Sequence, residues 1–419
     1  MAFSHAERSA AATLQGQAFP ARPARVPDLI HDDAQALNVA KRLADEFSID
    51  AALRDRERRL PWVELDAFVS SGLWGLTVPR AYGGAGVSNG ALAEVVATIS
   101  AADGSLGQIP QNHYYALEVL RVGGTHAQRR FFYERVLAGE RFGNALAEIG
   151  RKDFKRRTRL TRAAGDWYID GQKFYCTGAL YAHWIPTLVV ADEDGQDVTY
   201  LVFVPRAAQG VSVTDDWDGF GQRVTGSGSV EFKRVPVQPE WVVPFQTSFE
   251  RPTTIGPFAQ IIHAAIDLGQ ARGAFAAMVP FIRERSRPWI DAKVAHAAAD
   301  PLTIAQVGEL AVQIRAAEAL VRRAARAVDA AQADPTERSV AEASIAVAEA
   351  RALTTTASLD AGSRLFELAG TAATLDGLGL DRFWRNARTH TLHDPVRWKY
   401  HAVGNFYLND KLPPRHGAL

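Results

Sequence analysis

The sequence has little cysteine, no net charge and no long hydrophobic run. Cys176 is the only cysteine among 419 residues, which excludes an internal disulfide framework and favours a reducing compartment such as the cytoplasm. Basic and acidic residues number 47 each, so the charge predicts neither a nucleic acid nor an anionic membrane as partner. No apolar run is long enough to span a bilayer, and no HExxH or CxxC spacing indicates a metal site. These absences predict a cytoplasmic protein with neither a nucleic acid nor a membrane as partner.

The residue pattern that predicts secondary structure changes along the chain. Residues 1–25 are rich in Ala, Arg and Pro and lack the apolar stretch of a secretory signal, which predicts a flexible leader. Residues 26–141 have helical periodicity, residues 142–246 have the pattern of strands and turns, and residues 247–419 are helical again. A chain of this length can bury an ample core in such an arrangement.

The N-terminal zone predicts several helices. Apolar residues recur at three- and four-residue steps from Leu37 to Phe47, which is the pattern of an amphipathic helix. Further helices are expected at residues 89–102 and 111–122, and Thr125 is a candidate N-cap for the next.

The middle zone predicts a β domain. The runs 167–169 and 173–175 flank Asp170 and Gly171, which predicts a hairpin. Short apolar runs predict further strands at residues 187–191, 200–204 and 226–232.

The C-terminal zone predicts a helix bundle. Apolar residues from Val307 to Val328 alternate steps of three and four, as in a bundle seam. Asp334 is expected to cap the next helix, with Glu337 at the capping-box position, and Gly370 to end it.

The most informative stretch is residues 381–395. His390 and His393 lie three apart and share a helix face, and Pro395 disfavours helix at Asp394, so a helix is expected to end there. Imidazoles and a carboxylate presented together favour a proton-handling or anion-binding site. On these residues alone, a solvated surface helix fits equally well.

Two motifs carry a resemblance to a known family. Residues 76–84 resemble the Pro-x-x-Tyr-Gly-Gly loop of the acyl-CoA dehydrogenase superfamily, and residues 380–398 resemble its C-terminal Arg-Asp-Ala-Arg segment. The resemblance covers residues 32–408. It implies an α+β fold with an N-terminal α-helical domain, a middle β-barrel domain and a C-terminal four-helix bundle.

Two departures point to one branch of that superfamily. His393-Asp394-Pro395-Val396 stands where the dehydrogenases have Tyr-Glu-Gly-Thr with its catalytic base, and Arg287-Pro288-Trp289 stands where they have a Phe-Gly that supports FAD. FAD is therefore less favoured. The sequence instead resembles flavin-dependent monooxygenases of the dibenzothiophene type and related sulfur-acquisition oxidoreductases. The matching segments are residues 101–107, 215–217, 225–229, 287–289, 382–386 and 394–395.

The resemblance implies a mechanism and a set of site residues. Such enzymes use reduced FMN from a separate flavin reductase, form a C4a-(hydro)peroxyflavin and pass one oxygen atom to an organosulfur or similar small substrate. They assemble as homotetramers, and the Ala-rich helices here fit that assembly. Arg287 is expected at the FMN phosphate and Trp217 against the flavin ring. Hydrogen bonds to the ring are expected from Asn144 and Thr177. The predicted donors to the reacting oxygens, and the groups that orient them, are His390, His393 and Asp394. His393 beside Asp394 suggests an imidazole supported by a carboxylate.

The segment 107–115 leaves the substrate open. Gln108 stands where the dibenzothiophene enzymes have histidine, and Asn112 where they have tyrosine, so a bulky aromatic thiophene is not assumed. Asn112 and His113 are candidate catalytic residues. His113 fits a satisfied core histidine equally well.

Two other functions stay open. The first is an FAD-dependent acyl-CoA dehydrogenase with Asp394 as base. The second is a non-catalytic flavin-binding protein.

Overall fold

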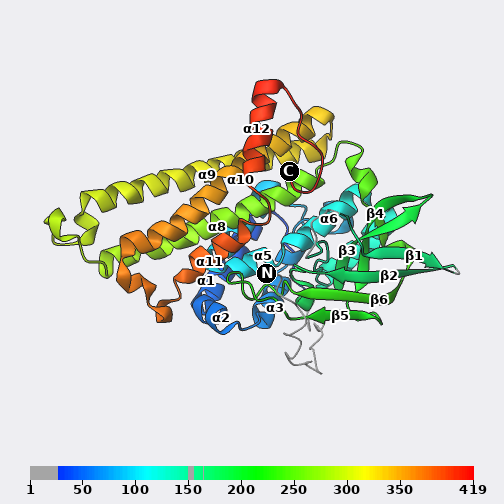
Figure 1. Cartoon of the computed structure of the whole chain (residues 1–419), viewed down its shortest axis with the longest axis horizontal. Coiled ribbons are helices and arrows are strands. Elements are labelled where there is room, and N and C mark those ends of the chain that lie inside the picture. Colours follow the sequence, from blue (N-terminus) through cyan, green and yellow to red (C-terminus); the bar gives the residue numbers. More distant parts are fainter. Residues whose placement is uncertain (1–26, 150–154, 164) are drawn as a thin grey trace, which may run out of the picture.

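The computed structural model describes residues 27–149, 155–163 and 165–419, so the predicted leader of residues 1–25 lies outside the described residues. The described part of the chain runs from helices through one sheet to a second set of helices (Figure 1). The N-terminal helices are α1 (Asp33–Ile49), α2 (Ala51–Glu57), α3 (Trp62–Ser70), α4 (Asn89–Ala102), α5 (Gly104–Gln108), α6 (Gln111–Gly123) and α7 (His126–Leu137).

The predicted N-terminal helices are confirmed. The apolar face of α1 buries Ala40, Leu43 and Phe47, and α4 has the predicted bounds. Thr125 caps α7 in a capping box with Gln128, in which each side chain accepts from the other's backbone N–H.

The middle of the chain forms a seven-stranded sheet. Its strands are β1 (Arg159–Ala163), β2 (Asp166–Lys173), β3 (Trp184–Glu193), β4 (Gln196–Pro205), β5 (Val211–Thr214), β6 (Ser229–Val237) and β7 (Val242–Pro244). They pair in the order β5-β6-β2-β1-β3-β4-β7, antiparallel except for β1 beside β3. Within the described strands, β5 and β7 are therefore edges, and the sheet is open where a β-barrel was expected.

The predicted hairpin at Asp170 and Gly171 is wrong. Residues 166–173 form one strand, β2, and its register against β6 shifts between Ile169 and Gly171, which marks a β-bulge. Gly171 has φ +147°, and a Cβ there would lie 2.6 Å from Cα of Thr158, so glycine is required. The local hairpin joins β1 to β2, with Ala163 opposite Asp166.

Aromatic side chains attach α7 to the sheet. The ring of Phe132 lies 4.3 Å from that of Phe203 on β4 and 5.3 Å from that of Trp184 on β3, measured between centroids. This cluster fixes the sheet against the N-terminal helices, because offset and edge-to-face aromatic pairs favour defined geometries.

Five helices complete the chain. They are α8 (Ile255–Glu284), α9 (Pro301–Ala333), α10 (Glu337–Ala369), α11 (Asp381–His390) and α12 (Arg397–Asn409). Figure 1 shows α8, α9 and α10 side by side, with the strands at the opposite end of the molecule. The predicted seam of α9 is buried from Leu310 to Val328 and packs against its neighbours.

Two predicted helix ends differ from the structure. Thr336, and not Asp334, caps α10, because Thr336 Oγ1 accepts from the backbone N–H of Ser339 while Asp334 ends α9. Helix α11 ends at His390, four residues before the predicted end, and a turn carries His393 and Asp394 beyond it. Gly370 ends α10 as predicted, with φ +80°.

Across the described ranges, no helix combines the length and the apolar character that crossing a membrane requires.

Candidate functional site

A large cavity lies where the helices meet the sheet. Its volume is about 1250 Å³, and its walls come from α6, α8, β3, the loop of residues 217–227 and the turn after α11. Small-molecule sites commonly have about 300–1,000 Å³. This cavity therefore has room for a flavin ring and a second small molecule together.

The structure brings together three residues predicted to hold the flavin ring. Asn144, Thr177 and Trp217 all line the cavity. Asn144 Oδ1 accepts from the backbone N–H of Leu146 at 2.9 Å, and the Thr177 hydroxyl shares a hydrogen bond of 2.8 Å with Ser227. These bonds fix the polar groups on a wall that also carries the flat indole of Trp217.

The loop that carries Trp217 is held by Gln222. The indole N–H of Trp217 donates to the backbone O of Gln222 at 3.0 Å, and the backbone N–H of Gln222 donates to Asn386 Oδ1 on α11 at 2.6 Å. Gln222 has φ +49°, a left-handed conformation that is uncommon for non-glycine residues. Strained backbone concentrates at functional sites, and here it fixes the indole against the cavity.

His393 faces the cavity in one defined tautomer. Its Nδ1 lies 2.7 Å from the backbone O of His390, and because a carbonyl only accepts, Nδ1 carries the proton. In the neutral ring, Nε2 is then an acceptor, and the side-chain nitrogen of Gln108 lies 3.2 Å from it. Desolvation inside the protein and the neighbouring His390 lower the pKa of His393 to about 4, although the side chain is exposed to the cavity.

The carboxylate-supported imidazole is His390 rather than His393. His390 is 0% exposed, and its Nδ1 lies 2.5 Å from Asp267 Oδ1, whereas His393 turns Nδ1 to the backbone and not to Asp394. The expected His393–Asp394 pairing is therefore corrected. His390 lies behind the cavity wall and does not line it.

Asp394 lines the cavity beside two cations. Its Oδ2 lies 3.7 Å from Lys399 Nζ and 3.9 Å from an Arg351 guanidinium nitrogen. Burial lowers the pKa of Lys399 to about 8, although the charge of Asp394 opposes that shift. The carboxylate therefore serves first as a counter-ion in this wall.

Asn112 and His113, adjacent on α6, have different surroundings. Asn112 lines the cavity. His113 is 0% exposed, and its Nε2 donates to the backbone O of Trp74 at 2.9 Å while its Nδ1 accepts from the backbone N–H of Phe142 at 3.2 Å. Burial lowers the pKa of His113 to about 3. His113 thus has the surroundings of a satisfied core histidine.

Arg287 does not reach the cavity of its own chain. It is exposed in the loop after α8, while the cationic residues in the cavity lining are Arg156 and Arg415. Arg415 also donates to the backbone O of Phe249 at 3.0 Å, which ties the C-terminal tail over this wall.

Sequence reasoning missed His263 and Asp267. Both belong to the buried apolar part of α8, and His263 Nδ1 lies 3.0 Å from His390 Nε2. A signal was available, because an aspartate and a histidine four residues apart in an otherwise apolar helix are costly unless paired. Gln222 was also missed, and Gln108 was considered only for substrate choice and not as a partner of His393.

Hydrogen bonds account for the closeness of the three clustered imidazoles. The candidate ligand atoms of His263, His390 and His393 lie within 4.8 Å of one another. Both ring nitrogens of His390 are engaged, Nδ1 with Asp267 and Nε2 with His263 Nδ1, and His393 Nδ1 is bonded to the backbone O of His390. The arrangement is therefore suited to holding protons.

Comparison with known families matches all three parts of the chain. The models described as acyl-CoA dehydrogenase N-terminal, middle and C-terminal domains match residues 32–140, 151–235 and 261–398, respectively. The chain belongs to the acyl-CoA dehydrogenase family. The predicted order of a helical, a sheet and a second helical domain is thereby confirmed.

Relatives within this family are flavin-dependent monooxygenases. A dibenzothiophene monooxygenase of Rhodococcus erythropolis is 35% identical over 91% of this chain and 95% of its own length. The probable FMNH2-dependent monooxygenase SfnC of Pseudomonas putida is 34% identical over 90% of this chain and 96% of its own. The predicted monooxygenase branch of the acyl-CoA dehydrogenase family is therefore confirmed.

A solved structure has the same architecture. TdsC of Paenibacillus sp. A11-2, in complex with FMN and indole, superposes with a TM-score of 0.88 at 32% identity, covering 92% of this chain and all of that one. Methanesulfinate monooxygenase MsuC of Pseudomonas fluorescens superposes with a TM-score of 0.85 at 31% identity, covering 91% and 99%.

Proposed function

We propose that this protein is the oxygenase of a two-component system. It takes reduced FMN from a separate flavin reductase and transfers one oxygen atom, by way of a C4a-(hydro)peroxyflavin, to a small organosulfur substrate. The observation that carries the proposal is the cavity of about 1250 Å³, which joins the Trp217 wall to a cluster of neutral imidazoles. Relatives that bind or use FMN share the fold over nearly the whole chain.

The wall fits the chemistry of FMN. A flavin ring needs a flat apolar surface and hydrogen bonds at its polar edge, which Trp217, Asn144 and the Thr177–Ser227 hydroxyl pair can supply. Its phosphate needs a cation, and Arg156 is available in the same lining. Bound FMN would supply the oxygen-activating chemistry, while the residues of the chain bind, orient and hold protons.

The imidazole end of the cavity is suited to oxygen transfer. Neutral His393 places Nε2 at the wall beside Gln108, and Asn112 adds an amide nearby in the lining. Fixed polar groups in a site that excludes water are the general means of stabilising developing charge. Related enzymes act on dibenzothiophene and on methanesulfinate, so we propose a sulfur centre as the oxygen acceptor.

Arg287 and the assembly belong to the same proposal. Arg287 is exposed and is not among the residues that line the cavity of its own chain, whereas the family resemblance implies a role at the FMN phosphate. Both statements hold if Arg287 reaches the cavity of a neighbouring copy in a homotetramer. Exposed apolar residues favour such an assembly, notably Trp398, Tyr400, Tyr407 and Leu408 on α12.

One experiment tests the function directly. Purified protein is mixed with reduced FMN and then with oxygen, with dibenzothiophene or methanesulfinate present, and flavin absorbance and oxygenated product are followed. We expect a transient absorbance band of an oxygenated flavin and a product that carries one added oxygen atom. Rapid oxidation to FMN and peroxide with both probes would contradict the proposal.

The remaining alternative rests on Asp394, which is a carboxylate in the cavity lining. If the protein is an acyl-CoA dehydrogenase, bound FAD should bleach when an acyl-CoA is added without oxygen.

A further inference from the structure

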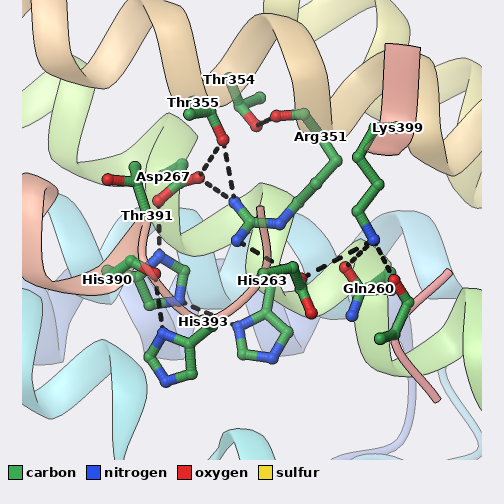
Figure 2. A network of polar contacts seen from close by, with 12 residues as sticks. Gln260, His263, Asp267, Arg351, Thr354, Thr355, His390, Thr391, His393 and Lys399 are labelled. Carbon is green, nitrogen blue, oxygen red and sulfur yellow. Dashed lines mark hydrogen bonds and ion pairs between the residues drawn. The ribbon is translucent and has the colours of Figure 1, made fainter. Parts of the chain in front are cut away.

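Three polar side chains extend in a line from the cavity wall into the protein interior, joined by hydrogen bonds. His263 on α8 lines the cavity, His390 lies behind it, and Asp267 lies behind His390 (Figure 2). Asp267 follows His263 by about one helical turn, so both side chains leave the same face of α8. Asp267 and His390 are each 0% exposed.

Asp267 is held as an ionised carboxylate. Its Oδ2 forms an ion pair with Arg351 and accepts from the Thr355 hydroxyl at 3.1 Å. Burial alone would raise the pKa of the Asp267 carboxyl, but the charge of Arg351 and the contact with His390 outweigh it and lower that pKa. Asp267, the group farthest from the cavity in this line, therefore carries a fixed negative charge.

That charge fixes both imidazole tautomers. A carboxylate only accepts, so His390 Nδ1, at 2.5 Å from Asp267 Oδ1, carries a proton. In neutral His390, Nε2 is bare and accepts from His263 Nδ1 at 3.0 Å. Neutral His263 then presents a lone pair at Nε2. In the part of the chain that the structure describes, no side chain or backbone group is bonded to that atom.

The line can take up one proton without leaving a cation on the cavity wall. If Nε2 of His263 gains a proton, the proton between the two rings moves to His390 Nε2. The positive charge then lies on His390 beside Asp267, and His263 is again neutral with an N–H at Nε2. On His263 itself that charge is disfavoured, because burial and then the neighbouring His393, His390, Arg351 and Lys399 all lower its pKa. Burial lowers the pKa of His390 as well, but there the charge of Asp267 and its hydrogen bond oppose the shift.

We propose that Asp267, His390 and His263 form a proton relay that gives and takes back one proton at Nε2 of His263. This inference rests on the proposed function. Reduced FMN, oxygen and substrate yield FMN, oxygenated substrate and water. The oxygen atom that leaves as water must gain a proton inside the cavity, and reduced FMN must release one. His263 is then the exchanging group, and His390 and Asp267 are positioning residues.

The first test needs neither flavin nor turnover. The flavin-free protein is prepared with ¹⁵N-labelled histidine rings, and the signals of His263 are assigned by their loss in His263→Asn. We expect a neutral His263 ring at pH 7 with its proton on Nδ1. A neutral ring with the proton on Nε2 would overturn the relay.

A second variant tests the positioning role of Asp267. In Asp267→Asn the amide can donate to His390 Nδ1, so the line of hydrogen bonds should reverse and His263 should carry its proton on Nε2. An unchanged His263 tautomer in a folded Asp267→Asn protein would overturn the relay. If that variant does not fold, the relay is judged by the tautomer of His263 in the unsubstituted protein.

The last test measures catalysis. In His263→Asn the amide nitrogen can replace Nδ1 as donor to His390, so the fold and FMN binding should persist while proton exchange is lost. We expect oxygenation of dibenzothiophene or methanesulfinate to fall by about 100-fold, with partial recovery on adding imidazole. The matched control is His126→Asn, which is exposed on α7 and outside the cavity lining, and should oxygenate normally.

The outcomes separate the two proposals. Normal oxygenation by His263→Asn would reject the relay and leave the monooxygenase function intact. If the unsubstituted protein oxygenates neither probe, the proposed function fails, and the tautomer of His263 still decides whether the line exists.

Discussion

At the scale of single residues, the site depends on which imidazole touches which partner. His390 and His393 are three residues apart, yet one is bonded to a buried carboxylate and the other to a backbone carbonyl. The sequence indicated that both belong to the site. It could not show that Asp267, more than a hundred residues earlier, would take the place expected for Asp394.

His393 is the residue whose loss should uncouple the reaction. His393→Ala should leave reduced FMN binding nearly unchanged, because the cavity wall that we propose for the flavin is formed by Trp217 and Asn144. It should divert reduced flavin and oxygen toward free peroxide, since a polar group at the reacting end is lost. Peroxide release and oxygenated product are measured together.

Asp394→Asn is the matched comparison for His393→Ala. Its effect should be milder and in the same direction, because Asp394 acts as a counter-ion to Lys399 and Arg351. An inactive Asp394→Asn protein together with normal coupling in His393→Ala would instead favour the dehydrogenase.

The buried core histidine gives a pH prediction. The pKa of His113 is about 3 in the folded protein against 6.5 ordinarily. Between these values the unfolded chain binds a proton that the folded protein does not, so the free energy of unfolding falls as the pH falls through this window. When urea unfolding is measured at pH 7 and at pH 4, the free energy of unfolding should therefore fall less for His113→Gln than for the unsubstituted protein. Equal losses would mean that His113 is protonated when folded.

At the scale of elements, the spacing of apolar residues predicted the long helices well. A local turn signal, in contrast, gave a wrong prediction within the sheet. The bounds of α4 and the seam of α9 follow from apolar spacing, which is a property of the segment itself. Asp170-Gly171 is as compatible with a bulge as with a turn. Pairing with β6, some sixty residues later, selects the bulge. That choice is tertiary and could not be read locally.

The start of α10 allows a test at this scale. Thr336 makes the cap and Asp334 ends the preceding helix, so Thr336→Ala should lower the free energy of unfolding by about 0.5–2 kcal/mol. Asp334→Ala should cost less, because its side chain is not the acceptor in this cap. Denaturant titration of both variants decides, and a larger effect at Asp334 would contradict the assignment.

At the scale of the whole molecule, the cavity is a product of assembly from distant segments. Its lining draws on residues from Gln111 to Ala418, so no local window of sequence contains it. The family resemblance nevertheless predicted several lining residues, among them Asn144, Trp217 and His393. It could not show that Arg287 lies outside the cavity of its own chain.

The proposed role of Arg287 predicts both an assembly and an affinity. Light scattering should show a tetramer at micromolar protein. Arg287→Ala should weaken FMN binding by about 1.5–3 kcal/mol, the scale of a charge-assisted hydrogen bond. Arg283→Ala, an exposed arginine on the last turn of α8, is the control and should bind FMN normally. A stable monomer, or an unchanged affinity in Arg287→Ala, would reject this assignment.

The ion pair between Asp267 and Arg351 has a consequence for how such chains can diverge. The two residues are 84 positions apart and both fully enclosed. Losing either one alone removes the oppositely charged group that is bonded directly to the buried ion, and breaking a buried pair in this way costs about 3–5 kcal/mol. Descendants of a common ancestor should therefore keep both or replace both, and intermediates with only one should be rare.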